Sequence, residues 1–138
     1  MNAPSGSRAV LVLTAHEDLT ADAVISELNR RGASVARMDT GDFPIRSQLA
    51  ATISATGVEG RLRVNGVEMD LGSVESIYYR RPTRFRFPDA LSDADRVLAA
   101  TEARLGFGGV LGALDALWVN HPARVAIAEY KPIQLHIA

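Results

Sequence analysis

A chain of 138 residues has the size of one domain, and its 47% hydrophobic and 22% charged residues are typical of globular proteins. The net charge of −1 excludes a general attraction for nucleic acid or anionic membranes, and the absence of cysteine excludes disulfides and thiolate chemistry. No apolar run approaches the roughly 18 residues of a membrane span, and the segment MNAPSGSR lacks the apolar core of a secretion signal, so we expect none. We expect a cytoplasmic protein with a flexible tail at residues 1–7.

The first predicted elements are a strand, a helix and a second strand. The run AVLVL, residues 9–13, is apolar throughout, as in a strand buried on both faces of a sheet. Apolar residues then recur on one helix face, at Ala21, Val24, Ile25 and Leu28. Asp18 or Thr20 can cap this helix and Gly32 can end it. Because SVARMD then resumes an extended pattern, the order predicts a right-handed βαβ unit.

The next predicted element is a β-hairpin centred on Asn65-Gly66, preceded by the β-leaning segment ATISATG. Asn-Gly favours a type I′ turn, which needs positive φ at both central residues. A two-residue loop pairs Val64 with Val67, Arg63 with Glu68, Leu62 with Met69 and Arg61 with Asp70. One face of the hairpin is then apolar, and the other carries two pairs of opposite charge.

The second half of the chain is predicted to be mainly helical. SVESIYY is a strand candidate, and a long helix begins at Ser92 and continues through GFGGVLGALDAL to Trp118. Its predicted apolar side consists of Val97, Leu98, Thr101 and Leu105. WVN forms a short strand or loop, and HPARVAIAEY forms a helix with Pro122 near its start. Pro132 begins a last helix of about seven residues, too short to be stable alone, so we expect it to continue into a larger protein.

Two motifs do not support the nucleotide sites that they superficially resemble. The glycine run GFGGVLG follows a helical pattern and has no Lys-Ser/Thr after it, so it is not a phosphate loop. We expect these glycines to let the helix approach a neighbour closely. The segment TAHEDLTAD after the first strand has no glycine, so the pyrophosphate-binding turn is missing, which argues against a nicotinamide or flavin cofactor.

The acidic residues of the first half are interpreted as structural. His16, Glu17 and Asp18 are adjacent in sequence and would rarely point at one ion, so no metal site is expected there. Asp39 and Asp42 in MDTGDFP are interpreted as turn formers.

The candidate binding residues are an arginine cluster and one lysine. Arg80, Arg81, Arg84 and Arg86 fall within YYRRPTRFRF, after a predicted buried strand. In open α/β sheets ligands bind at this end of the strands, and guanidinium groups suit carboxylates and phosphates. An ordinary loop with packed phenylalanines and solvated arginines explains the segment equally well. Lys131 precedes Pro132 at a helix start, where an anion could bind.

Four segments resemble the N-terminal region of ATP-grasp ribosomal peptide maturases, the ligases that make graspetides, including the microviridin-type macrocyclases. These segments are RMDTGDFP, IYYRRPTRFRFP, TEARLGFGGVLGALDALWVNHP and AEYKPIQLHIA, and the resemblance runs from about Arg8 to Ala138. It implies an α/β fold: a Rossmann-like pre-ATP-grasp domain with a mostly parallel sheet, an added β-hairpin and helices on both faces. It also implies a domain over residues 8–120 and a helical connection, 121–138, into an ATP-grasp catalytic domain.

The resemblance implies a chemistry that uses ATP and Mg²⁺. Such enzymes phosphorylate a carboxylate of a ribosomal precursor peptide, and a Ser, Thr or Lys side chain then attacks the acyl phosphate, which gives an ω-ester or ω-amide ring. Lys131 matches a lysine that contacts ATP phosphates, whereas Asn120 is assigned a structural role. The remaining phosphate, adenine and Mg²⁺ ligands are expected in the catalytic domain, so these 138 residues alone are not expected to ligate a substrate.

Two functions therefore stay open. The first is the N-terminal domain of an ATP-dependent peptide ligase, with its own ATP-grasp domain, the precursor peptide and a second copy in a homodimer as partners. Arg80, Arg81 and Arg84 would then face the substrate or nucleotide. The second is a non-catalytic α/β binding module that holds an acidic peptide through the same arginines.

Overall fold

The computed structural model describes residues 8–137, so the tail predicted for residues 1–7 lies outside the described part. Its centre is a parallel sheet of four strands in the order β2-β1-β6-β7. These strands are β1 (Ala9–Thr14), β2 (Ser34–Met38), β6 (Val74–Arg80) and β7 (Leu117–Val119). The predicted βαβ unit is confirmed, because β1 and β2 pair in parallel on either side of the helix α1, Leu19–Arg30.

A second sheet of three antiparallel strands packs on one face of the first. It consists of β3 (Ser47–Ser54), β4 (Gly57–Val64) and β5 (Val67–Asp70). The predicted register of the β4–β5 hairpin is confirmed pair by pair, and Asn65 and Gly66 have φ values of 49° and 78°. The predicted Arg61–Asp70 charge pair is wrong. Arg61 instead lies 3.4 Å from Glu68, and the Asp70 carboxylate accepts the N–H of Gly72 at the short helix η2, Leu71–Ser73.

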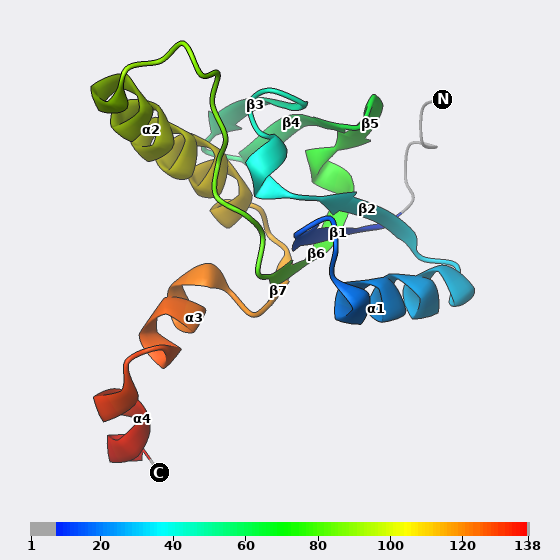
Figure 1. Ribbon diagram of the computed structural model, residues 1–138. Helices are drawn as coiled ribbons and strands as arrows, with labels where there is room; N and C mark the ends of the chain where they lie inside the picture. Colours follow the sequence, from blue (N-terminus) through cyan, green and yellow to red (C-terminus); the bar gives the residue numbers. More distant parts are fainter. Residues whose placement is uncertain (1–7, 138) are drawn as a thin grey trace.

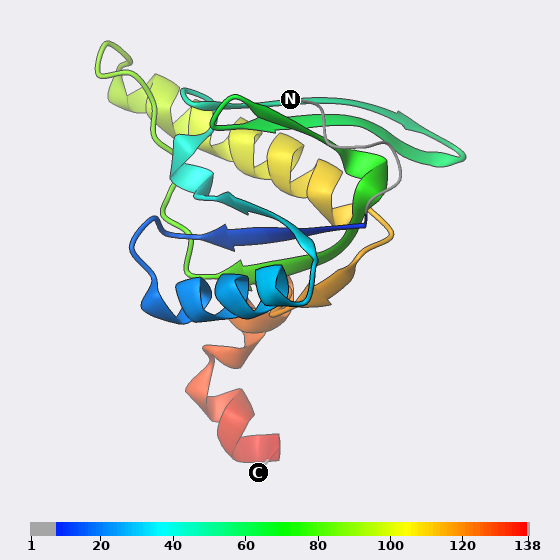
Figure 2. The same cartoon turned by 90° about the vertical axis from the view of Figure 1, so that its right-hand side faces the viewer.

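Helices cover both faces of the parallel sheet, as predicted (Figure 1). α1 lies on one face, and the long helix α2, Asp93–Gly112, lies on the other together with the small sheet. Two short helices, α3 (Pro122–Ala128) and α4 (Lys131–Ile137), lead away from the sheet in both views (Figures 1 and 2). No helix within residues 8–137 has the length and hydropathy that a membrane crossing requires.

The main core lies between the parallel sheet, α2 and the small sheet. Leu11 and Leu13 point into it because alternate residues of a strand face opposite sides. The other large buried members come from the small sheet, η2, β6 and α2, and include Leu62, Leu71, Ile77, Phe107 and Leu111. Burial of such side chains contributes about 1.5–3 kcal/mol each and is the main force that holds the layers together.

The helix predicted from Ser92 begins there, with Ser92 as its N-cap, but its predicted end is wrong and its apolar side is not the one that is buried. The buried residues are Ala103, Phe107 and Leu111, whereas Val97, Leu98 and Leu105 are exposed. α2 has apolar residues on two sides. The spacing of these residues in the sequence does not show which side is buried, because that is set by the contacts of Phe107. The helix also ends at Gly112 and not at Trp118.

The expectation that the glycine run lets α2 approach a neighbour is also wrong for the described structure. A Cβ atom added at Gly106, Gly108, Gly109 or Gly112 would meet nothing within 4 Å. These glycines lie on the open side of the helix, and packing against the core does not require them.

Candidate functional site at the carboxyl edge of the parallel sheet

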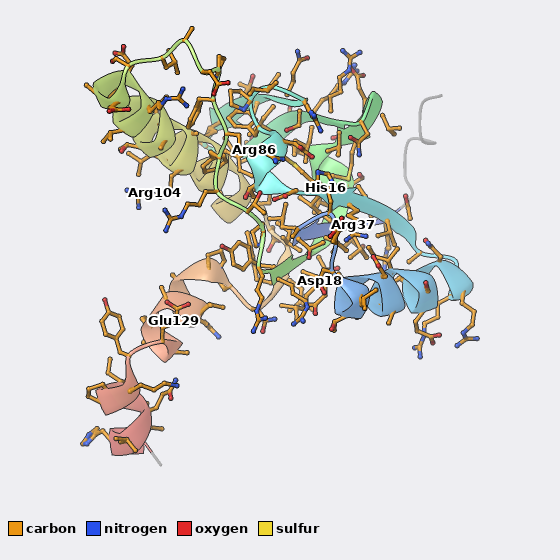
Figure 3. All side chains as sticks on the ribbon, in the orientation of Figure 1. His16, Asp18, Arg37, Arg86, Arg104 and Glu129 are labelled. Atoms are coloured by element: carbon orange, nitrogen blue, oxygen red, sulfur yellow. The ribbon has the colours of Figure 1, made fainter. Side chains whose placement is uncertain are left out.

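Three loops meet where the parallel strands end. They are the turn after β1 (residues 15–18), the segment with the short helix η1 after β2 (Thr40–Asp42) and the loop after β6 (residues 81–91). Figure 3 shows His16, Asp18, Arg37 and Arg86 gathered around this edge. Because the carboxyl ends of parallel strands share one edge, residues far apart in sequence can form one site there.

Asp18 joins the first turn of α1 to the end of β6. Its carboxylate accepts the N–H groups of Thr20 and Ala21, at 3.1 and 3.0 Å, as the predicted N-cap. It also accepts the hydroxyl of Thr14, at 3.0 Å, and forms an ion pair of 3.0 Å with Arg80. The Ala21 N–H, followed by Arg80 and Thr14, lowers the pKa of Asp18 from 3.8 to about 2. The carboxylate in turn raises the pKa of Arg80.

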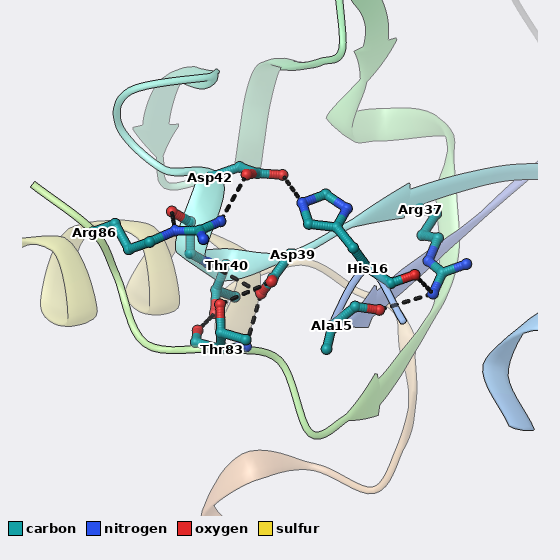
Figure 4. Close-up of polar contacts among 9 residues, drawn as sticks. Ala15, His16, Arg37, Asp39, Thr40, Asp42, Thr83 and Arg86 are labelled. Atoms are coloured by element: carbon teal, nitrogen blue, oxygen red, sulfur yellow. Dashed lines mark hydrogen bonds and ion pairs between the residues drawn. The ribbon is translucent and has the colours of Figure 1, made fainter. Parts of the chain in front are cut away.

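Asp39, at the end of β2, is buried and binds the loop after β6. It accepts the N–H and the hydroxyl of Thr83, at 2.7 and 2.8 Å, and the N–H of Gly41, at 3.1 Å. Thr40 donates its hydroxyl to the carbonyl of Thr83 (Figure 4). Gly41 is required for this close approach, because a Cβ there would overlap Thr83 Oγ1 and lie 3.0 Å from Arg84 O.

Asp42, also buried, connects all three loops. Its two carboxylate oxygens lie 2.9 Å from His16 Nε2 and 3.1 Å from Arg86 Nη2 (Figure 4). Arg86 Nε donates to the carbonyl of Gly41 at 3.0 Å. Asp39 and Asp42 thus form turns, as predicted, and in addition hold distant segments together.

Two further contacts fix the loops. Arg37 on β2 donates to the carbonyls of Ala15 and His16, at 2.7 and 2.6 Å (Figure 4). It also pairs with Asp22. An aromatic cluster of Phe43, Phe85 and Phe107 has ring centroids 5.0–6.1 Å apart and anchors the loop after β6 to α2. Such packing of large apolar rings, with edge-to-face geometry, restricts the loop.

The structure divides the predicted arginine cluster into two groups. Arg80 and Arg86 form ion pairs with Asp18 and Asp42. Arg81 and Arg84 are exposed, and within residues 8–137 neither forms an ion pair or a side-chain hydrogen bond. Arg81 has a φ of 47°, a left-handed conformation that turns the chain directly after β6. The ordinary-loop interpretation is therefore right for Phe85, which packs, while two guanidinium groups stay available to an anion.

Lys131 is not brought to this edge. It starts α4, is exposed, and its Nζ lies 3.2 Å from Gln134 Oε1. α4 continues from α3 away from the sheet, so Lys131 and the arginines do not form one site within the described residues (Figure 1).

A pocket of about 610 Å³ between β7 and α3 was missed by the sequence analysis. It is lined by Ala116, Leu117, Trp118, Asn120, His121, Arg124, Val125 and Ala128. Asn120 has a φ of 62°, as expected for a structural turn residue, and the rings of Trp118 and His121 lie 4.9 Å apart. The segment WVNHP, at the end of the last parallel strand, was the available signal.

The carboxylates at this edge are engaged by partners within the fold. The carboxylates of Asp18, Asp39 and Asp42 are already occupied by N–H, hydroxyl or guanidinium donors. Burial, and then Glu129, raises the pKa of Tyr79, so this phenol stays protonated at neutral pH. Within residues 8–137 no group of three His, Asp or Glu side chains is placed to hold a metal.

The sequence matches the family model described as the MvdD pre-ATP grasp domain over residues 9–126. The fold resembles that of the macrocyclase MdnB from Microcystis aeruginosa MRC, with 28% identity and a TM-score of 0.85 over 95% of this chain and 43% of that one. It also resembles the macrocyclase MdnC from the same organism, which was solved with the precursor peptide MdnA. Here the identity is 22% and the TM-score 0.82, over 94% of this chain and 42% of that one.

A third similar structure is a RiPP-associated ATP-grasp ligase from Chryseobacterium gregarium, solved with ADP and a leader and core peptide. Its sequence is 22% identical to this chain and the TM-score is 0.82, over 94% of this chain and 40% of the ligase. The chain thus spans less than half the length of each of these structures. No curated protein matches the sequence.

Proposed function

Because the chain belongs to the family of the MvdD pre-ATP grasp domain, we propose that it is the N-terminal domain of an ATP-dependent ligase that modifies ribosomal precursor peptides. The observation that carries this proposal is the family match over residues 9–126. The similarity of the fold to that of MdnB over 95% of the chain supports it. The exposed arginines beside the end of β6 support it, since precursor carboxylates are anions. The cysteine-free composition fits a reducing cytoplasm.

The proposed reaction has two steps. A peptide carboxylate takes the γ-phosphoryl group of ATP and ADP leaves. A Ser or Thr hydroxyl or a Lys amine of the same peptide then attacks the acyl carbon, inorganic phosphate leaves, and an ω-ester or ω-amide ring forms. Catalysis of such transfers consists mainly of positioning and charge neutralisation.

The arginines are assigned to the acidic peptide. Arg81 and Arg84 would pair with its carboxylates, and the partly exposed guanidinium of Arg80 would add to the same positive surface while Asp18 holds it in place. Arginine suits this role because its N–H groups can meet both oxygens of a carboxylate.

The residues of this part of the chain suit an ATP phosphate but not Mg²⁺. Lys131 can supply one charged contact to an ATP phosphate, because its side chain is exposed and its Nζ bonds to the neutral Gln134. Mg²⁺ does not fit the described residues, since the edge carboxylates are already occupied. We therefore assign the metal ligands to an ATP-grasp domain of the same protein. The exposed apolar residues of α3 and α4, among them Ile127, Tyr130, Leu135 and Ile137, are suited to pack against that domain.

The test is to trap the acyl phosphate. The intact protein is incubated with ATP, Mg²⁺ and an acidic peptide that contains Ser, Thr and Lys, with hydroxylamine present. We expect a peptide hydroxamate and ADP in equal amounts, and in the absence of hydroxylamine a peptide that has lost one water per ring. ADP formation without hydroxamate or ring would overturn the proposal.

The arginine assignment predicts a loss of peptide affinity without a loss of stability. Arg81→Asn and Arg84→Gln, combined, should weaken binding of the acidic peptide about tenfold or more, since charged hydrogen bonds contribute roughly 1.5–3 kcal/mol each. Asn suits the positive φ of residue 81. The control is Arg104→Gln on α2. Equal affinities for both variants would contradict the assignment.

The alternative, a non-catalytic module that holds an acidic peptide, is favoured by the two exposed arginines alone. It predicts that peptide binding is independent of ATP and that no hydroxamate forms. The trapping experiment therefore separates the two functions.

A further inference from the structure

The second step of the proposed reaction needs a group that accepts a proton. A hydroxyl or amine loses a proton as it attacks an acyl phosphate, and a positioned side chain that takes this proton typically accelerates such a step about 10²–10⁴-fold. At the carboxyl edge of the sheet, the carboxylates of Asp18, Asp39 and Asp42 are occupied by donors, and the phenol of Tyr79 stays protonated. The imidazole of His16 at the same edge is a further candidate.

The ring of His16, in the turn after β1, is held by a buried carboxylate. Its Nε2 lies 2.9 Å from Oδ2 of Asp42, a side chain that is only 2% exposed (Figure 4). The other oxygen of Asp42 accepts from Arg86 Nη2 at 3.1 Å, so the carboxylate is itself fixed. The main-chain carbonyl of His16 accepts from Arg37 Nη2 at 2.6 Å. Both the backbone and the ring of His16 therefore have a fixed position before any ligand binds.

These contacts determine which nitrogen of His16 can act as a base. An ionised carboxylate only accepts hydrogen bonds, so Nε2 of the neutral ring carries the hydrogen and Nδ1 carries the lone pair. Within residues 8–137 Nδ1 has no hydrogen-bond partner, and the side chain is 49% exposed. A base oriented by a third group is the arrangement that activates a nucleophile. The carboxylate of Asp42 would also stabilise the imidazolium that forms when Nδ1 takes a proton.

The other histidines and the neighbouring Glu17 lack this arrangement. Nδ1 of His121 already accepts the N–H of Ala123 at the start of α3. His136 lies on α4, which leads away from the sheet (Figure 1). Glu17 is exposed, and no contact within residues 8–137 fixes its carboxylate. In the described part of the chain, His16 alone combines an oriented ring with a free basic nitrogen.

His16 also lies beside the loop that carries the exposed arginines. Asp42, which holds its ring, follows Gly41 in η1, and a Cβ at Gly41 would lie 3.0 Å from the carbonyl oxygen of Arg84. The short helix η1 thus contacts both the ring of His16 and the loop after β6. A peptide whose carboxylates pair with Arg81 and Arg84 would therefore lie close to the turn that carries His16.

We propose that His16 is the general base of ring formation, an inference that rests on the proposed ligase function. The attacking hydroxyl or amine of the peptide gives its proton to Nδ1 as its oxygen or nitrogen bonds to the acyl carbon. The bond from that carbon to the phosphate oxygen breaks, and phosphate leaves with the electron pair. The imidazolium then passes the proton to the phosphate or to water. Asp42 acts through His16 as a positioning residue.

Competition with hydroxylamine tests this role in the intact protein. Hydroxylamine is a strong nucleophile that takes the acyl group without a base, so the hydroxamate reports the first step alone. His16→Gln keeps an N–H that can donate to Asp42 but has no basic nitrogen. With ATP, Mg²⁺, the acidic peptide and a fixed concentration of hydroxylamine, the ratio of ring to hydroxamate should fall about 100-fold or more relative to wild type.

This ratio does not depend on how much of the variant is folded, because both products come from the same acyl phosphate. Glu17→Gln, on the same turn, is the matched control and should keep the wild-type ratio. An unchanged ratio in His16→Gln, an equal fall in Glu17→Gln, or a loss of hydroxamate together with the ring in His16→Gln would overturn the role of His16 and leave the ligase proposal standing. A wild-type protein that forms no hydroxamate would instead overturn the ligase proposal, and the role of His16 with it.

Discussion

Asp18, Asp39 and Asp42 each bind donors from more than one segment of the chain. Asp39 and Asp42 are buried, and every contact described for them is with an N–H, a hydroxyl, an imidazole or a guanidinium group. A buried carboxylate that lost such donors would carry the full cost of its desolvation. These residues therefore stabilise the loops that hold the candidate site.

The lowered pKa of Asp18 predicts a pH dependence of stability. Because its pKa falls from 3.8 to about 2 on folding, chiefly through the Ala21 N–H, the carboxylate stabilises the fold above the unfolded pKa. This contribution is lost as the pH falls from about 4 toward 2. Asp18→Asn should lower the melting temperature at pH 7, and the difference from wild type should shrink toward pH 2. Glu17→Gln, at the exposed neighbouring position, is the control. A difference that does not vary with pH would contradict the role of the charge.

Gly41 predicts a steric effect on the same edge. Gly41→Ala should lower the free energy of unfolding by about 1–3 kcal/mol, as overpacking does, because the new Cβ would overlap Thr83 Oγ1. Denaturant unfolding measures the change. Gly41→Ala combined with Thr83→Ala should recover part of the loss caused by the clash, and strict additivity of the two substitutions would contradict the proposed contact.

At the scale of elements, local turn chemistry explains the successful predictions. The β4–β5 register follows from Asn65-Gly66, because a two-residue loop leaves one way to pair the flanking residues. The cap at Asp18 and the positive φ of Gly32 likewise depend only on neighbours in sequence. The ion pairs of Arg80 and Arg86 could not be predicted, because their partners lie 62 and 44 residues away.

The orientation of α2 shows where periodicity is insufficient. Val97, Leu98 and Leu105 form a regular apolar stripe, yet the opposite side is buried. The side that faces the core is chosen by Phe107, which meets Phe43 and Phe85 from two distant loops. A helix that is apolar on two sides leaves this choice to tertiary contacts.

The open glycines of α2 predict a stabilising substitution. Gly106→Ala should raise the free energy of unfolding by about 1 kcal/mol, because alanine favours a helix interior and its Cβ would meet nothing within 4 Å. Thermal unfolding and denaturant unfolding both measure this change in the free energy of unfolding. The control is Gly41→Ala, for which the free energy of unfolding should fall. A lower free energy of unfolding for Gly106→Ala would show that the helix has a neighbour at Gly106.

For the whole molecule, the position of Lys131 on a helix that leaves the sheet predicts a separable effect on ATP. In the intact protein Lys131→Ala should weaken ATP binding about tenfold or more, the loss of one charged hydrogen bond. Lys131→Arg should retain most of the affinity, because it keeps the charge. The melting temperature without ATP should not change, since the side chain is exposed and its hydrogen bond to Gln134 lies at the surface. Unchanged calorimetric affinity for ATP in Lys131→Ala would reject the assignment.

The loop after β6 is exposed over much of its length, but Thr83 and Arg86 attach it to Asp39 and Asp42. Exchange of residue 84, or of residue 81 for one that tolerates its left-handed backbone, would thus alter the charge offered to a ligand while Asp39 and Asp42 keep the backbone where it is. With Arg81 and Arg84 assigned to the peptide as proposed, the charge that the loop presents can therefore be changed at these two positions without a change in the contacts of Asp39 and Asp42.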